Sequence, residues 1–191
     1  GLVILETSYA EEDYAIGMNK DNTALLEAVN GALKELTEDG TIPAIVEKYM
    51  AAISERTGRK YELFSYYGAE DAEEVIVLMG SASEAAREAI DYANAHGKKY
   101  GMVSVHLYRP FSVKHLLKAV PQSCKRIAVL DRTKEPGSNG EPLLLDVKDA
   151  FYGVENAPVI VGGRYGLGSA DVTPAMILGV YENLELPQPK D

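Results

Sequence analysis

The stretch Ile127-Ala-Val-Leu-Asp-Arg-Thr-Lys-Glu-Pro-Gly-Ser-Asn-Gly-Glu-Pro142 joins a short aliphatic run to a segment that neither helix nor strand tolerates. Residues 127–130 are all apolar and predict a buried strand. From Asp131 to Pro142 there are five charged side chains, two prolines and two glycines. Because Pro removes a backbone donor and Gly costs conformational entropy, this segment predicts a loop. It follows a strand, and open α/β sheets place functional surfaces at the carboxyl ends of their strands.

The same alternation of aliphatic strand and helix runs through the chain from about residue 72. The expected strands are 75–79, 100–107, 127–130 and 159–161, and each precedes a segment with helical spacing. Four such units predict an α/β domain with a parallel sheet covered by helices on both faces. Ser81 and Glu84 have the spacing of a capping box at the start of the first helix, and Thr173-Pro174 is typical of a helix start. The tyrosine-rich segment 61–67 is interpreted as a connection, and 162–168 as a glycine-rich loop.

The first fifty residues follow a different order, strand-strand-helix-helix. Strands are expected at 2–5 and 14–18, and a helix capped by Asp21 or Asn22 is expected to end at Gly40. Pro43 suits the first turn of the second helix. The domain organisation predicted from these patterns is residues 1–50, a connection 51–71, and the α/β domain 72–191.

Composition excludes several classes of function. The net charge is −10, and residues 1–50 hold ten Asp or Glu against three Lys, so we expect no nucleic-acid binding. No apolar run approaches the roughly 20 residues that span a bilayer, so we expect no transmembrane helix and no membrane partner. We also expect a cytoplasmic location. The chain starts at Gly1 without a signal peptide pattern, which favours an upstream segment having been removed. Cys124 is the single cysteine, so no internal disulfide, zinc site or iron–sulfur cluster is expected.

The histidine and serine residues, which are catalytic or bind metals in many other proteins, are interpreted here as mainly structural. His96, His106 and His115 are too scattered for a metal site, and His106 is placed in the middle of a strand. Ser81 and Ser169 lie outside any Gly-x-Ser-x-Gly motif. The segment 162–168 has two interpretations, a phosphate-binding loop or a tight loop that packs against a neighbouring domain. The loop 131–136 likewise is either a solvated loop or an interdomain contact.

From about Ile42 onward the chain resembles domain II of pyruvate:ferredoxin (flavodoxin) oxidoreductase, also called pyruvate synthase. The resemblance rests on seven ordered segments over about 150 residues: 46–50, 57–61, 66–69, 75–81, 107–111, 128–137 and 162–169. It implies a fold like the C-terminal domain of transketolase-type enzymes. The parent family uses thiamine diphosphate, magnesium, coenzyme A and iron–sulfur clusters to convert pyruvate to acetyl-CoA, and reduces ferredoxin or flavodoxin.

This chain departs from that scheme, because the thiamine-binding halves and the cysteine clusters are missing. The resemblance therefore implies a core domain that positions the catalytic domains and is inactive alone, with no catalytic residue and no cofactor of its own. Its expected partners are other domains of the parent, and exposed docking patches predict self-association. The candidates for interdomain contact are Arg109, Asp131, Arg132, Lys134, Glu135, Gly162, Gly163, Arg164 and Tyr165.

Residues 1 to about 50 resemble something else, the C-terminal end of periplasmic amino-acid-binding proteins of ABC transporters. The segments that carry this resemblance are 9–16, 22–26 and 33–41. The chain is thus expected to be a chimera whose seam lies near residues 40–50. Two alternatives follow for its function, an amino-acid-binding receptor fragment or a chimera without activity.

Overall fold

The computed structural model describes residues 2–3, 18–19 and 21–191, and the chain divides into two units, residues 1–60 and 61–191. In the first unit, strand β1 (Leu2–Val3) pairs antiparallel with β2 (Met18–Asn19). The remainder of the strands predicted at 2–5 and 14–18 lies outside the described residues. Helices α1 (Thr23–Glu38) and α2 (Thr41–Thr57) follow.

The ends of these two helices agree with the sequence pattern. The Asn22 side chain accepts a hydrogen bond from the Leu25 amide at 3.1 Å and so caps α1. Gly40 has φ +81 and ends α1 in the left-handed conformation that glycine adopts without cost. Both helices expose large apolar side chains, namely Leu25, Leu33, Leu36, Ile45, Tyr49 and Ile53.

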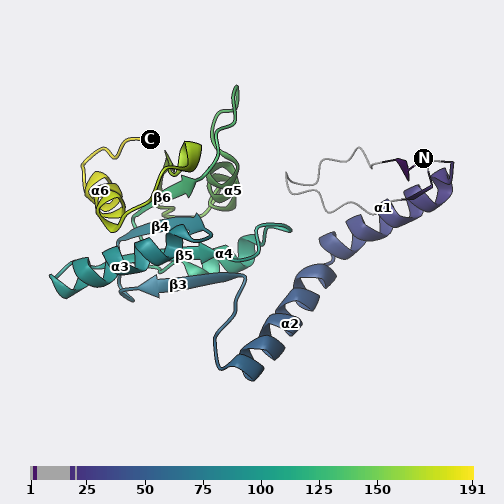
Figure 1. Cartoon of the computed structure of the whole chain (residues 1–191), viewed down its shortest axis with the longest axis horizontal. Coiled ribbons are helices and arrows are strands. Elements are labelled where there is room, and N and C mark those ends of the chain that lie inside the picture. Colours follow the sequence, from purple (N-terminus) through teal and green to yellow (C-terminus); the bar gives the residue numbers. More distant parts are fainter. Residues whose placement is uncertain (1, 4–17, 20) are drawn as a thin grey trace. The chain divides into compact units, whose positions relative to one another are not determined.

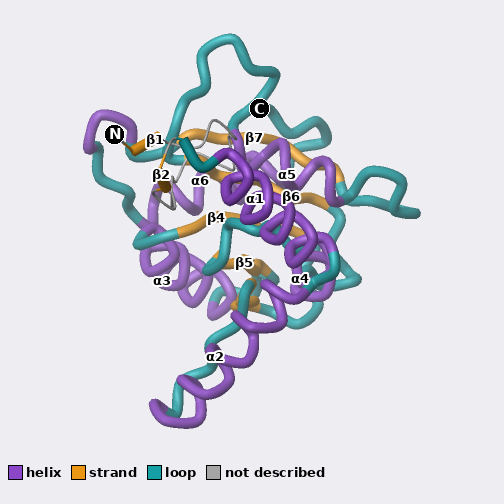
Figure 2. Tube along the Cα trace, turned by 90° about the vertical axis from the view of Figure 1, so that its right-hand side faces the viewer, coloured by secondary structure: helices purple, strands orange, loops and turns teal. Residues whose placement is uncertain are grey.

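The second unit is built on a five-stranded sheet with the order β3-β5-β4-β6-β7. Its strands are β3 (Phe64–Gly68), β4 (Glu74–Met79), β5 (Tyr100–Val105), β6 (Arg126–Asp131) and β7 (Val159–Arg164). The last four are mutually parallel, which confirms the predicted α/β class, and β3 runs antiparallel to β5. Figure 2 shows β7, β6, β4 and β5 one below another.

The predicted four-stranded sheet was therefore one strand short. The segment 61–67 is not only a connection, since Phe64 pairs with Val105 and Gly68 with Gly101. The Tyr66 hydroxyl donates to the Ala69 carbonyl. A side chain at Gly101 would collide with the Tyr66 ring, so glycine at that position leaves room for Tyr66 when β3 pairs with β5.

Helices cover both faces of this sheet (Figures 1 and 2). They are α3 (Ala82–Ala95), α4 (Val113–Ala119), α5 (Pro142–Ala150) and α6 (Pro174–Leu184), with a short 3₁₀ turn at Leu167–Ser169. Helices α3 and α6 contact each other, as do α4 and α5. Fully buried Ile76, Leu78 and Met102 join Ile90, Ile177 and Tyr181 in one continuous core beneath α3 and α6.

Of the two helix starts predicted in this unit, one is confirmed and the other is wrong. The Thr173 hydroxyl accepts from the Met176 amide at 3.4 Å and caps α6, as predicted. The capping box predicted for Ser81 and Glu84 was wrong, because the Ser81 side chain makes no capping hydrogen bond. Instead the Ser83 hydroxyl donates to the Gly80 carbonyl at 2.7 Å. Among the described residues, no helix combines the length and the apolar character needed to cross a membrane.

Candidate functional site

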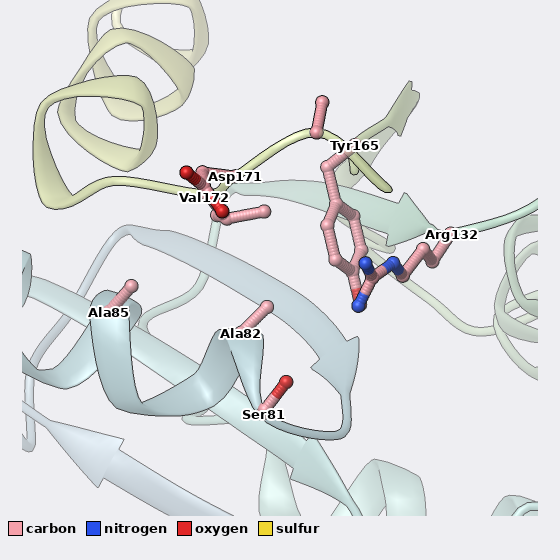
Figure 3. Close-up of a pocket in the computed structure, with 8 residues that line it drawn as sticks. Ser81, Ala82, Ala85, Arg132, Tyr165, Asp171 and Val172 are labelled. Atoms are coloured by element: carbon pink, nitrogen blue, oxygen red, sulfur yellow. The ribbon is translucent and has the colours of Figure 1, made fainter. Parts of the chain in front are cut away.

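The strand order places a topological switch point at the carboxyl ends of β4 and β6. The chain leaves β4 toward β5 on one side, and then crosses to β6 on the other side. Open α/β sheets have a crevice at such a point. A cleft of about 170 Å³ lies there, lined by Ser81, Ala82, Ala85, Arg132, Tyr165, Ala170, Asp171 and Val172 (Figure 3).

Tyr165 and Arg132 form one wall of this cleft. The Tyr165 hydroxyl donates to the Met79 carbonyl at 3.0 Å, so the end of β7 is tied to the end of β4. Burial raises the pKa of Tyr165, and the phenol stays a neutral donor. Arg132 Nε donates to the Gly166 carbonyl at 3.3 Å, and Figure 3 shows its guanidinium beside the Tyr165 ring. Arg132 is exposed and makes no ion pair within the described part of the chain.

Asp131, the last residue of β6, holds the start of α5. Its side chain is only 2% exposed, and its two oxygens accept hydrogen bonds from the Leu143 amide at 3.0 Å and the Leu144 amide at 3.1 Å. The helix start therefore finds acceptors for two of its unpaired N–H groups. Burial raises the pKa of the Asp131 carboxyl, against the effect of these two amides, and the nearby Glu141 and Asp146 add to the rise.

Glu141 is the second buried carboxylate, at 3% exposure, and it fixes the loop that Asp131 begins. It accepts from the Glu135 amide at 2.7 Å and from Arg164 Nε. Burial by itself would raise the pKa of Glu141, but hydrogen bonds from Arg164 and the Glu135 amide, with the charges of Arg164 and Lys134, lower it overall. The loop 132–140 is thus tied down at its base.

Arg109 braces the loop after β5 against the same helix. Its guanidinium lies 2.8 Å from the Asp146 carboxylate of α5 and 3.8 Å from the centroid of the Tyr108 ring. The Arg109–Pro110 peptide bond is cis. Burial and the hydrogen bond to Asp146 raise the pKa of Tyr108. The loops after β5 and β6 and the last residue of β7, Arg164, therefore all contact α5 or its N-cap residue Glu141.

Gly162 and Gly163 do not lie in a loop, which corrects the prediction for 162–168. They belong to β7 with Arg164, and pair with Val129, Leu130 and Asp131 of β6. A Cβ at Gly162 would lie 2.4 Å from the Leu144 side chain, and one at Gly163 would lie 2.7 Å from the Leu130 side chain. Close packing of α5 and β6 on β7 therefore accounts for both glycines.

The nine candidate residues now fall into three sets. Arg109, Asp131 and Arg164 are paired inside the unit, and Glu135 is held through its amide. Gly162, Gly163 and Tyr165 pack or tie the sheet together. Arg132 and Lys134 alone among the nine are exposed cations without an ion pair in the part of the chain that the structure describes. Sequence reasoning missed Glu141, Asp146 and Tyr108, although the Glu141-Pro142 pair at a helix start was a usable signal.

The residues present do not fit a metal or an iron–sulfur cluster. Within the described residues no group of three His, Cys, Asp or Glu side chains is suited to hold a metal ion. Cys124 is buried, and burial raises the pKa of its thiol to about 12, so the thiolate that a cluster requires is disfavoured. His106 follows β5 and does not lie in mid-strand as predicted, and burial lowers its pKa.

Comparisons with known proteins agree with this fold and identify the family to which the chain belongs. A family model described as pyruvate:ferredoxin oxidoreductase core domain II matches residues 72–177. The pyruvate-flavodoxin oxidoreductase of Enterobacter agglomerans is 57% identical over 150 residues, which cover 78% of this chain and 13% of that protein. The pyruvate:ferredoxin oxidoreductase of Moorella thermoacetica is 50% identical over 149 residues, with 78% and 13% covered.

A solved structure has the same fold. It is the 2-oxoglutarate:ferredoxin oxidoreductase from Magnetococcus marinus, with a TM-score of 0.52 and 19% identity. The match covers 81% of this chain and 23% of that one. The chain thus spans only about an eighth of the length of its similar curated relatives, the 13% given above.

Proposed function

Because this chain belongs to the pyruvate:ferredoxin oxidoreductase core domain II family, we propose that it is the scaffold portion of a larger 2-oxoacid oxidoreductase and that it positions other domains of that enzyme. The observation that carries this proposal is the braced carboxyl edge of the sheet. Asp131 and Glu141 fix the loop after β6 and Arg109 fixes the loop after β5, both at α5, and the side chains of Arg132 and Lys134 are left exposed. A fixed loop loses little conformational entropy on docking, so such an edge is suited to an interface.

The chemistry of the parent would then come from outside this chain. Pyruvate as substrate, thiamine diphosphate, magnesium, coenzyme A and iron–sulfur clusters as cofactors, ferredoxin or flavodoxin as electron acceptor, and a cytoplasmic location are all proposed for the parent. Within the described residues the lack of a metal-binding cluster and the raised thiol pKa of Cys124 support placing the cofactors elsewhere. We expect no pyruvate-dependent ferredoxin reduction by the purified chain, and measurable turnover would contradict the proposal.

The decisive experiment replaces domain II in the Enterobacter relative with residues 61–191 of this chain. The hybrid is expected to assemble and to reduce flavodoxin with pyruvate. The double variant Arg132→Gln, Lys134→Gln in the hybrid is expected to lower that activity at least about tenfold, because two charges at a desolvated interface are lost. The matched variant Lys98→Gln, Lys99→Gln changes two cations at the opposite edge of the sheet and is expected to keep it. Equal activity of the two variants would show that the outward cations do not dock a domain.

For residues 1–50 we propose a separate origin, in the C-terminal segment of an amino-acid-binding receptor. The family model matches residues 72–177 and so leaves residues 1–50 outside the match, which supports a seam near residues 40–50. Calorimetry with polar and basic amino acids tests whether any binding accompanies this segment. The ligand-contacting loops of such receptors lie upstream, so no heat of binding is expected, and micromolar affinity would favour the receptor alternative.

A further inference from the structure

Strand β7 has an open side. Within residues 61–191 it is the last strand in the sheet order, and β6 is the one strand with which it pairs there. The Val159 amide donates to the Lys125 carbonyl at 2.9 Å and the Tyr165 amide to the Asp131 carbonyl at 3.1 Å, so odd-numbered residues of β7 face β6. The N–H and C=O groups alternate in direction along a strand. Ile160, Gly162 and Arg164 therefore present both groups to the open side.

The Gly162 amide confirms this direction, because it donates outward to Asp191 Oδ1 at 2.6 Å. The tail that carries Asp191 is held by Asn183, whose side chain accepts from the Lys190 amide at 3.1 Å and donates to the Lys190 carbonyl at 2.9 Å. Asp191 itself is exposed and covers only the middle of the edge. The outward backbone groups of Ile160 and Arg164 have no backbone partner within the described residues.

This edge lacks the features that prevent strand pairing. Its sequence, Val159-Ile-Val-Gly-Gly-Arg164, contains three β-branched residues, no proline and no lysine. Its six residues pair with β6 in unbroken register, so no bulge turns the edge away. The Arg164 side chain is engaged by Glu141 and does not screen the backbone. A strand edge without these features is a template for pairing with another strand.

We propose that the outer edge of β7 pairs with β7 of a second copy of this chain, antiparallel about a two-fold axis at Gly162. In that arrangement Gly162 faces Gly162 of the second copy, and Ile160 faces its Arg164. Each of these facing pairs exchanges both N–H···O bonds, since all the residues concerned point outward. Glycine at the axis leaves room for the backbones to meet, and the identical strand supplies the complementary pattern without any other partner.

The contact is short, so the association is of the weak class, with a dissociation constant on the order of 100 µM. Asp191 competes with it, because its carboxylate occupies the Gly162 amide at the axis in each copy. This inference is independent of the docking function proposed above, which uses the loops after the strands and not the strand edge.

Sedimentation equilibrium from about 10 µM to about 1 mM measures the association. Asp191→Ala frees both central amides and is expected to tighten the dimer about tenfold, since each freed bond changes the equilibrium severalfold. Ile160→Pro deletes an outward donor that β6 does not use and is expected to abolish the dimer. Ile160→Ala trims the same side chain, keeps the N–H group and is expected to dimerise like the unaltered chain.

Isotope-filtered NMR on a mixed labelled sample identifies the contact. The geometry places the α-hydrogen of Val161 next to that of Gly163 in the second copy, because this is a non-hydrogen-bonded pair with α-carbons about 4.5 Å apart. Three outcomes overturn the proposal. One is a monomer at 1 mM in the Asp191→Ala variant, another is equal dimerisation of Ile160→Pro and Ile160→Ala, and the third is intermolecular contacts at α1 and α2 in place of β7.

Discussion

The amino ends of the parallel strands (the amino edge) carry exposed ion pairs, whereas the carboxyl ends (the carboxyl edge) carry two buried carboxylates. At the amino edge Lys99 pairs with Asp71 and Lys125 pairs with Glu73, and these side chains are between 47% and 63% exposed. At the carboxyl edge the carboxylates of Asp131 and Glu141 are 2% and 3% exposed and bind backbone amides. Exposed pairs contribute little because water and salt screen them, whereas a buried carboxylate left without its donors is costly. Burial therefore decides which charges set loop geometry.

Asp131 gives the largest expected effect on this contrast. Asp131→Ala removes two charged hydrogen bonds and leaves two buried amides at the start of α5 without acceptors. The free energy of unfolding is expected to fall by about 3 kcal/mol. Urea denaturation measures it, with the exposed Asp149→Ala on the same helix as the control. A loss below about 1 kcal/mol would show that water replaces the carboxylate and that the edge is not braced from within.

The second-largest expected loss of stability is at the glycines of β7. Gly162→Ala drives a methyl group into the Leu144 side chain and is expected to cost about 1–3 kcal/mol of unfolding free energy. Gly179→Ala in α6 meets no atom within 4 Å and is expected to gain about 0.5–1 kcal/mol, because alanine has the higher helix propensity. Thermal unfolding of the two variants separates close packing from a general intolerance of side chains. An equal loss in both would remove the packing explanation.

The two buried carboxylates are expected to respond oppositely to pH. The folded-state pKa of Glu141 is lowered from 4.5, so its stabilising contribution is present above that pH and is lost as the pH falls. The folded-state pKa of Asp131 is raised from 3.8, so its contribution is larger at low pH and is lost as the pH rises through the raised value. Urea midpoints between about pH 3 and 7, compared with Glu141→Gln and Asp131→Asn, measure both.

Each carboxylate is judged by the difference in stability between the unaltered chain and its own amide variant, measured at each pH. The stability difference between the unaltered chain and Glu141→Gln is expected to shrink as the pH falls, and the difference from Asp131→Asn is expected to shrink as the pH rises. Two differences that change in the same direction would mean that one environment governs both carboxylates.

The smallest effect is expected at the amino edge. Lys99→Gln removes an exposed ion pair with Asp71, and both side chains are more than 60% exposed. We expect no resolvable change in the urea midpoint at 0.15 M salt, because the Debye length there is about 8 Å. A shift as large as that of Gly162→Ala would mean that the two edges are stabilised alike.

Local signals in the sequence predicted much of the fold. Asn22 and Thr173 cap helices as expected, because an N-cap depends on a few adjacent residues. The four aliphatic strands were found, because burial on both faces leaves a continuous apolar run. The capping box failed because Ser81 has helical backbone angles, φ −64° and ψ −20°, whereas a capping residue needs an extended backbone.

What the sequence did not reveal depends on distant partners. Strand β3 lacks an aliphatic run, and its pairing with β5 joins residues about 40 positions apart, such as Phe64 and Val105. Gly162 and Gly163 suggested a loop because the helix that needs them bare, α5, packs through Leu144 only in the folded chain. The pairing of Arg109 with Asp146 joins two elements in the same way, and no spacing rule predicts it.

The ring of Tyr181 in α6 lies parallel to that of Tyr100 in β5, with centroids 4.1 Å apart and planes 2° apart. The Tyr181 hydroxyl donates to the Gly101 carbonyl at 2.8 Å, so the stack holds only while α6 rests on the sheet. The chain has twelve tyrosines and no tryptophan. Coupled phenol transitions in near-ultraviolet circular dichroism thus give an intrinsic optical reporter of α6 docking, without any attached dye.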